Sequence, residues 1–381
     1  MLDGASMKGG AVDGSAWSGH RGLPGTDLES ALVGVYSARC RGGDGSGMGR
    51  ILPADRTRFY GYGRQALTEA LRLAGVKEGD EVLLPGFLCG EVLASLAVLG
   101  TVPRFYSVDE RLRADVASWD REVFGSIRAV VMVNYFGFPQ FLGPVQAWCR
   151  AHGATLIEDN AHGFLSEDGE VPLGRRGDLG VFSLRKTLAL PNGAALVDNR
   201  VNNKMDPDGF SYGGSCRLAE WRYRSKVVLK RLIEWGGLKS ALVILACIRM
   251  ARLAATGHAI PVSSSRREIT MLQEACSSLT PQLLRRCDYV AECQRRRTLY
   301  QLCLDLFDGA PDVRPLFDHL PDGVVPQGFP FLYAGKDRRS LIKTWGQRGV
   351  PILSWPDHLP AAIHLHAPDH YGRVMFVPFL W

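Results

Sequence analysis

The stretch RAVVMVNYFGFPQFLGPVQAWCRAHGATLIED, residues 128–159, decides the fold class. It opens with a continuous apolar run (128–137), carries apolar residues at helical spacing in 143–153, and closes with a second apolar run, TLIED (155–159). Continuous apolar strands joined by a helix are typical of a parallel sheet that is covered on both faces. The stretch therefore predicts one strand–helix–strand unit of an α/β fold.

Apolar patterns of the same kind recur along the rest of the 381-residue chain. They predict helices at 63–75, 89–100 and 337–349, and strands at 81–87, 102–108, 324–334 and 350–355. We expect a large α/β domain at 51–258, with a mostly parallel central sheet flanked by helices. A smaller C-terminal α/β domain is expected at 259–381.

Three segments do not continue this alternation. Residues 1–50 hold 13 of the 43 glycines, which predicts a partly flexible segment. Residues 216–258 form a basic amphipathic helical region, which favours a structural insertion or a subunit contact over a membrane-surface or polyanion contact. Ser265 and Glu268 then have the spacing of a capping box, which predicts the start of another helix.

Composition limits the classes of function. A net charge of +6 is mild for this length, so we expect no nucleic-acid partner. Nine cysteines without a C-x-x-C pair predict reduced thiols and a cytoplasmic location. We see no secretory signal, and the longest apolar run of the basic region, 241–248, is too short to span a bilayer, so no transmembrane segment is expected.

The motif GYGRQA (61–66) matches the dinucleotide fingerprint G-x-G-x-x-A. That fingerprint needs an acid at the end of the next strand, whereas Asp80 and Glu81 precede theirs, so a nicotinamide enzyme is a distant alternative. Gly63 and Arg64 begin a helix, where free N–H groups and a cation favour a phosphate. A plain glycine turn before a helix is the other interpretation.

The motif ATLIEDNAHGF (154–164) ends a buried strand with Glu158 and Asp159 and places His162 three residues later. Adjacent strand residues face opposite ways, so only one of the two acids points into a given site. A charged loop with a solvent-facing histidine is the alternative. Further histidines occupy the proline-broken stretch 355–372, but their spacing matches no zinc motif and we expect no metal.

The segment GVFSLRKTLALPNGAALV (180–197) predicts a buried strand, a turn and a second strand, with Lys186 between the two strands. An ammonium group is costly to bury without a partner. Either Lys186 lies at a strand end and reaches solvent, or the site uses a neutral amine. A purely structural lysine is the alternative to a catalytic one.

Together these motifs fit pyridoxal 5'-phosphate (PLP), which needs a lysine, an acid for its pyridine nitrogen, phosphate donors and a neighbouring aromatic ring. At this point the chain resembles the DegT/StrS-like sugar aminotransferases, which are fold-type-I PLP enzymes. The resemblance covers about 59–199 and 267–378. It rests on the motifs GDEVLLPGF, YFGFP, HGATLIEDNAHGF, GDLGVFSLRK and GVPILSWPDHLP.

The resemblance implies roles for three chemically active residues. Lys186 would form the Schiff base with PLP and later move the proton. Asp159 would keep the pyridine nitrogen protonated, and His162 would lie near the 3-oxygen of the ring.

The resemblance also implies the residues that hold the cofactor. Ser183, Gly63 and Arg64 would bind the phosphate, although Ser183 precedes the lysine by three positions where many relatives have five. Phe87 would stack on the ring, but its offset differs from the usual aromatic position, which is Cys89 in this chain.

The implied activity is transfer of an amino group from an amino acid, glutamate or glutamine, to a keto acceptor. That acceptor would be a sugar, nucleotide-linked or not, or an intermediate of secondary metabolism, and the enzyme would be a homodimer. Two alternatives stay open: another PLP-dependent reaction, such as decarboxylation, a lyase reaction or condensation, and a catalytically silent PLP-fold binding protein.

Overall fold

The computed structural model describes residues 47–119, 126–201, 216–228, 275–310, 312–347, 350–356, 363 and 367–379. Residues 217–228 of the basic region are helical, as predicted. The predictions for residues 1–46, for the rest of the basic region and for the capping box after it lie outside the described residues. The same holds for three of the histidines near the C-terminus, His358, His364 and His366.

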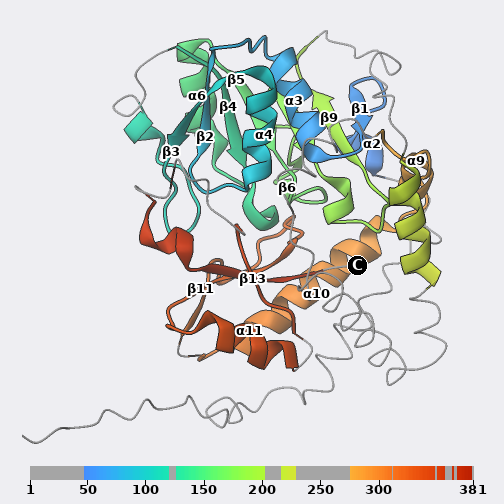
Figure 1. Cartoon of the computed structure of the whole chain (residues 1–381), viewed down its shortest axis with the longest axis vertical. Helices are drawn as coiled ribbons and strands as arrows, with labels where there is room; N and C mark the ends of the chain where they lie inside the picture. Colours follow the sequence, from blue (N-terminus) through green and yellow to red (C-terminus); the bar gives the residue numbers. More distant parts are fainter. Residues whose placement is uncertain are drawn as a thin grey trace, which may run out of the picture.

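A seven-stranded sheet of order β1-β9-β8-β5-β4-β2-β3 forms the upper part of the molecule in Figure 1. Its strands are β1 Thr57–Tyr60, β2 Glu81–Pro85, β3 Val102–Tyr106, β4 Ile127–Val133, β5 Thr155–Asp159, β8 Leu179–Phe182 and β9 Ala194–Asp198. From β3 to β8 neighbouring strands are parallel, whereas β9 is antiparallel to both β8 and β1. The predicted, mostly parallel central sheet is confirmed.

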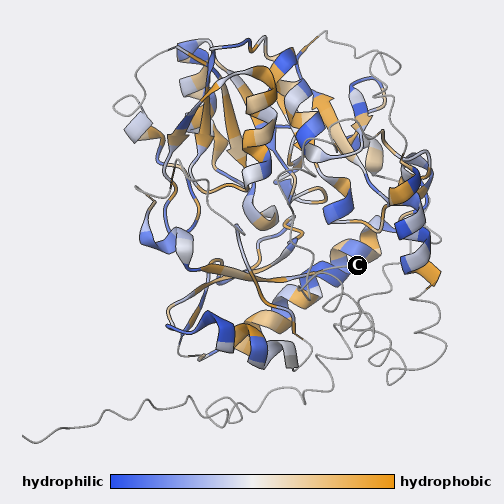
Figure 2. Cartoon of the chain, viewed as in Figure 1, coloured by the Kyte–Doolittle hydropathy of each residue, from blue (hydrophilic) through white to orange (hydrophobic). Residues whose placement is uncertain are grey.

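Helices cover both faces of this sheet because its strands are apolar on both sides. The helices beside it are α2 Met48–Ile51, α3 Gly63–Leu73, α4 Gly90–Leu99 and α6 Leu142–His152. Helices α3 and α4 share one apolar cluster with Ala129 and Val131 of β4, and α6 shares another with Val130 and Met132. Alternate residues of one strand thus fill two cores. Figure 2 shows these apolar central strands beside helices with one polar side.

A second sheet, antiparallel and of order β10-β11-β13-β12, comes from the C-terminal part of the chain. Its strands and helices are β10 Val313–Pro315, β11 Gly328–Tyr333, β12 Leu353–Ser354, β13 Val374–Pro378, α9 Leu279–Leu284, α10 Tyr289–Phe307 and α11 Arg338–Gln347. The expected strand, helix and strand correspond to β11, α11 and β12. The division of the chain at residues 258 and 259 stays a prediction, because both lie outside the described residues.

The long helix α10 is absent from the elements that the sequence predicts. Its buried side carries the charged residues Glu292 and Arg296 among apolar ones, which interrupts the apolar pattern. The helix packs against β11 and contributes to an apolar cluster shared by both sheets. In that cluster Phe138, in the loop after β4, stacks on Phe317 with a centroid distance of 3.7 Å and packs against Tyr300 of α10.

Short elements complete the chain. They are β6 Glu167–Asp168, β7 Val171–Pro172, and the 3-10 turns η3 Val116–Ser118, η4 Tyr135–Gly137, η5 Leu184–Lys186 and η7 Asp369–Gly372. Two of them, η4 and η5, directly follow the parallel strands β4 and β8 and so lie at the edge of the sheet where a ligand is expected. Within the part of the chain described, no helix has the length and hydropathy needed to cross a bilayer.

Candidate active site

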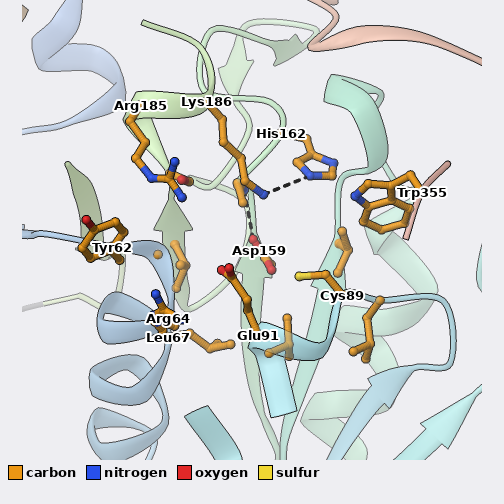
Figure 3. Close-up of a pocket in the computed structure, with 17 residues that line it drawn as sticks. Tyr62, Arg64, Leu67, Cys89, Glu91, Asp159, His162, Arg185, Lys186 and Trp355 are labelled. Carbon is orange, nitrogen blue, oxygen red and sulfur yellow. Dashed lines mark hydrogen bonds between the residues drawn. The ribbon is translucent and has the colours of Figure 1, made fainter. Parts of the chain in front are cut away.

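A pocket lies at the carboxyl ends of the parallel strands (Figure 3). The ends of β4, β5 and β8, the starts of α3 and α4, and one residue that follows β12 line it. Six of the seven site residues that the sequence predicts are among the lining residues: Gly63, Arg64, Asp159, His162, Ser183 and Lys186. Residues up to 123 positions apart in the chain therefore meet at one edge of the sheet.

Lys186 ends the turn η5 directly after β8, and its amine faces His162 (Figure 3). Lys186 Nζ lies 3.2 Å from His162 Nε2. On the other side of the ring, the backbone N–H of Phe136 donates to Nδ1 at 3.3 Å. A neutral imidazole has one proton, which must then be on Nε2. The Lys186 amine and the Nε2 edge of His162 therefore face each other inside the pocket.

His162 itself is deeply buried, with 4% of its surface exposed. Burial, and secondly the nearby Lys186, hold the pKa of His162 well below its ordinary value. Its ring makes an edge-on contact with Trp355, with centroids 5.3 Å apart. The imidazole is therefore neutral near pH 7 and fixed in orientation on two sides.

The two acids at the end of β5 point to opposite sides, as strand alternation predicts. Asp159 faces the pocket, and the Ala161 backbone N–H donates to its Oδ1 at 2.9 Å. Glu158 is buried away from the pocket, where its Oε1 lies 2.5 Å from Arg176 Nη2 and 2.9 Å from Asn134 Nδ2. The two carboxylates are neighbours in sequence with separate roles.

Competing effects act on Asp159. Burial raises the pKa of its carboxyl group, while the Ala161 N–H and the charge of Lys186 oppose that rise. A positive group brought next to Asp159 would favour its ionised form further. A pyridine nitrogen that keeps its proton is such a group.

The other side of the pocket is suited to an anion. Helix α3 begins at Gly63, and a Cβ added to that glycine would lie 3.6 Å from Ser183 Cβ, so the Ser183 side chain lies beside the start of the helix. The first turn of a helix offers N–H groups and a positive dipole end. The guanidinium carbons of Arg64 and Arg185 lie 5.4 and 5.2 Å from the ring centre of Tyr62.

We call Gly63, Arg64, Ser183 and Arg185 the anion end, and Asp159, His162 and Lys186 the proton-transfer end. Figure 3 shows Arg64, Tyr62 and Arg185 on one side of the pocket and His162 on the other, with Lys186 between them. The groups present, a cationic end for a phosphate, a lysine amine, an imidazole and a buried carboxylate, fit PLP.

Phe87 differs from the prediction. It is fully buried and does not line the pocket; its ring packs against Trp355 and Tyr371, with centroids 4.8 and 4.9 Å away. The chain leaves the sheet after Pro85, and the Phe87 ring turns into the aromatic cluster between the sheets. Cys89, at the start of α4, lines the pocket instead. Burial raises the pKa of its thiol, so Cys89 presents a neutral group.

Of the eleven lining residues that were not predicted from the sequence, six are aliphatic, and the other five are Tyr62, Cys89, Glu91, Arg185 and Trp355. Tyr62 and Arg185 adjoin residues that were predicted, so the motifs themselves could have pointed to them. Glu91 lies in the first turn of α4, where an acid is also explained by the helix dipole. Trp355 follows β12 in the second sheet, and no local signal links it to the pocket.

Comparison with known proteins agrees with this geometry. A relative from Streptoalloteichus tenebrarius, L-glutamine:2-deoxy-scyllo-inosose aminotransferase, is 31% identical over 157 residues, which are 40% of this chain and 37% of that protein. The chain spans about a third of the length of the curated relatives that it matches first.

Solved structures match over more of the chain. The aminotransferase TlmJ from Streptoalloteichus hindustanus has a TM-score of 0.58 at 20% identity, over 94% of this chain and 91% of that one. A GDP-4-keto-6-deoxymannose-3-dehydratase solved with a trapped PLP-glutamate geminal diamine has a TM-score of 0.54 at 15% identity, over 92% and 93%. These proteins share the fold that the sequence predicts.

The family assignment rests on a match of its own. The sequence pattern of the DegT/DnrJ/EryC1/StrS aminotransferase family matches residues 61–260, more than half of the chain. The match includes every predicted site residue, from Gly63 at the start of α3 to Lys186 after β8. The chain therefore belongs to the DegT/DnrJ/EryC1/StrS aminotransferase family.

Proposed function

We propose that the protein is a PLP-dependent aminotransferase. The observation that carries this proposal is the contact of 3.2 Å between Lys186 Nζ and His162 Nε2, in a pocket that also holds Asp159 and a cationic end. The donor would be glutamine or glutamate, and a keto sugar or keto cyclitol would be the acceptor. The name of the S. tenebrarius relative, with L-glutamine and a cyclitol ketone, supports both choices.

The anion end would hold the phosphate of PLP. The N–H groups at the start of α3 supply a dipole end, and Arg64 adds a charge that is 5% exposed and therefore little screened by water. Ser183 adds a hydroxyl beside Gly63. These groups orient the cofactor, and Asp159 at the opposite end would accept a hydrogen bond from its ring nitrogen.

Bound PLP supplies an electron sink that makes a proton on the donor Cα removable. Lys186 is the residue to move that proton, because its amine lies in the pocket and faces His162 Nε2 at 3.2 Å. His162 contacts the amine on one side, and the backbone of the turn η5 fixes the position of Lys186 itself. Asp159 would lie opposite the ring nitrogen and favour its protonated form.

The first test is reductive trapping of added PLP. Wild type should show a visible absorption band that borohydride removes, with the reduced cofactor attached to the peptide that contains Lys186. Lys186→Ala should show neither, whereas the control Lys77→Ala, at an exposed lysine, should behave as wild type. If wild type shows no band, the proposal is wrong.

A second test separates transamination from other PLP chemistry. Glutamine or glutamate, given to the PLP-loaded protein without an acceptor, should release one equivalent of the matching 2-oxo acid. A decarboxylase would release carbon dioxide instead, and a silent binding protein would leave the donor unchanged. Either of these results would contradict amino transfer while leaving the cofactor assignment in place.

The proposal includes two features of the whole protein. We expect a homodimer, which light scattering at several protein concentrations would test. We also expect a cytoplasmic location, because the sequence has nine cysteines without a C-x-x-C pair and no disulfide occurs among the residues described. No nucleic-acid partner is proposed.

A further inference from the structure

Arg296 of α10 is completely buried, and its side chain binds five acceptors. Its Nε donates to Glu292 Oε1 at 2.6 Å. Its two Nη atoms donate to four backbone carbonyls, those of Thr187 (2.8 Å), Pro326 (3.1 Å), Gln327 (3.3 Å) and Phe379 (3.2 Å). An arginine has five N–H donors, and here each one has an acceptor.

Such a buried cation is a costly way to hold a fold together, since an apolar side chain of similar volume often stabilises as much. Arg296 instead joins three backbone segments that lie far apart in sequence. They are the turn after Lys186, the entry to β11 and the exit from β13. A planar group with five fixed donors sets the relative positions of these segments.

One of these bonds leads directly to Lys186. The Thr187 carbonyl that accepts from Arg296 belongs to the residue after Lys186. The backbone N–H of Lys186 donates to the Ser183 carbonyl at 3.1 Å, and that of Thr187 donates to the Leu184 carbonyl at 3.1 Å. Arg296 thus holds the far end of the same turn that carries the amine.

A second route leads from Arg296 to His162. Gln327, whose carbonyl accepts from Arg296, donates its N–H to the Phe136 carbonyl at 2.9 Å. Phe136 in turn donates its own N–H to His162 Nδ1. Since His162 Nε2 faces Lys186 Nζ, these contacts close a ring of interactions that begins and ends at Arg296.

We propose that Arg296 is a positioning residue for the Lys186–His162 pair. Through Thr187 it fixes the amine, and through Gln327 and Phe136 it fixes the imidazole that faces the amine. Helix α10, which does not itself line the pocket, thereby sets a distance inside it. The catalytic meaning of this inference rests on the proposed aminotransferase function, whereas its geometric content does not.

Hydrogen exchange on the full chain without cofactor tests the geometry. In Arg296→Met, amides of residues 184–190 and 135–138 should exchange about tenfold faster or more, because both segments lose a fixed neighbour. The matched control is Arg297→Met on the same helix, since Arg297 donates to the carbonyls of Pro321 and Val324 at 2.8 Å. That control should speed exchange only near those two residues.

Arg296→Lys serves as a second variant in case Arg296→Met does not fold. Lysine keeps the charge beside Glu292 but has three donors for five acceptors. Faster exchange in both segments of a folded variant supports the proposal. Wild-type exchange rates in both segments of the folded variant overturn it.

Kinetics with the PLP-loaded enzyme test the consequence. A displaced amine should lower kcat by about 10- to 100-fold in Arg296→Met and change KM little, while Arg297→Met stays within about twofold of wild type. Unchanged kcat in the Arg296 variants would overturn the positioning role in an active aminotransferase. If wild type itself lacks activity, the proposed function fails, and the exchange rates still decide whether Arg296 positions the pair.

Discussion

The anion end and the proton-transfer end of the pocket lie on neighbouring loops but use opposite kinds of group. The anion end consists of backbone N–H groups, a hydroxyl and guanidinium groups, and guanidinium groups stay charged at every pH that a cell meets. The proton-transfer end consists of a carboxylate, an imidazole and an amine, and burial raises the pKa of the carboxyl group and lowers that of the imidazole. The two proposed tasks, holding the cofactor and moving a proton, thus belong to different parts of the pocket.

Changes at the proton-transfer end should therefore affect turnover, and changes at the anion end should affect cofactor affinity. Only the first kind should depend on pH. Three substitutions test the comparison, in order of decreasing expected effect.

The largest effect is expected for Asp159→Asn. Asparagine lacks the negative charge that favours a protonated ring nitrogen, so kcat should fall by about 100-fold or more while PLP still binds. Single-turnover release of the 2-oxo acid from glutamine measures this. The adjacent change Glu158→Gln is the matched control. It weakens the ion pair with Arg176 and should lower the unfolding free energy by about 3 kcal/mol. The rate per folded molecule should change little.

Equal losses of activity from Asp159→Asn and Glu158→Gln, at equal folded fraction, would contradict the assignment of the two acids to separate sides of β5. Denaturant unfolding monitored beside the single-turnover assay distinguishes a fall in stability from a fall in rate.

A smaller effect is expected for Arg64→Met at the anion end. Losing one charged donor to the phosphate should weaken PLP binding by about tenfold, with kcat at saturating PLP close to that of wild type. Equilibrium titration of the visible band at pH 6.5 and at pH 8.5 should give the same ratio of dissociation constants. Arg72→Met, at the other end of α3 beside Glu69, is the control and should leave PLP affinity unchanged.

The smallest effect concerns stability and pH in the protein without cofactor. The pKa of His162 is lowered in the folded state. As the pH falls below about 6.5, the imidazole therefore takes up a proton in the unfolded chain but stays neutral in the folded one. His162 therefore makes the unfolding free energy decrease toward low pH, by at most about 1.4 kcal/mol per pH unit. This stability is fully present above pH 6.5.

His162→Gln should remove that contribution, so its unfolding free energy should decline less than that of wild type between pH 6.5 and pH 5. Denaturant unfolding at several pH values measures the difference. Parallel curves for the two proteins over this range would mean that His162 is not held neutral.

Sequence reasoning could locate the strand ends but not every side chain that reaches them. The run TLIED is continuous and apolar up to its acids, so β5 and the position of Asp159 at its carboxyl end follow from local pattern. Lys186 follows in the same way from the turn after β8. Chain order and motif resemblance then supplied the roles of these residues.

Three features could not be obtained that way, for physical reasons. The rotation of the chain after Pro85, which buries Phe87 and exposes Cys89 to the pocket, depends on aromatic packing from the second sheet. Trp355 reaches the pocket only because the two sheets pack together. Helix α10 carries the proposed positioning residue Arg296 on its buried side, and this charged residue interrupts the apolar pattern by which a helix is recognised in sequence.

The place of Trp355 has an optical consequence. Its indole lines the pocket and lies with its ring centre 5.3 Å from that of His162. A PLP bound in the same pocket would be a neighbour of this indole and would accept part of its excitation energy. Arrival of the cofactor would thus dim the emission of Trp355, and its departure would restore it. Trp355, which follows a strand of the second sheet, can therefore serve as an intrinsic fluorescent probe of cofactor binding.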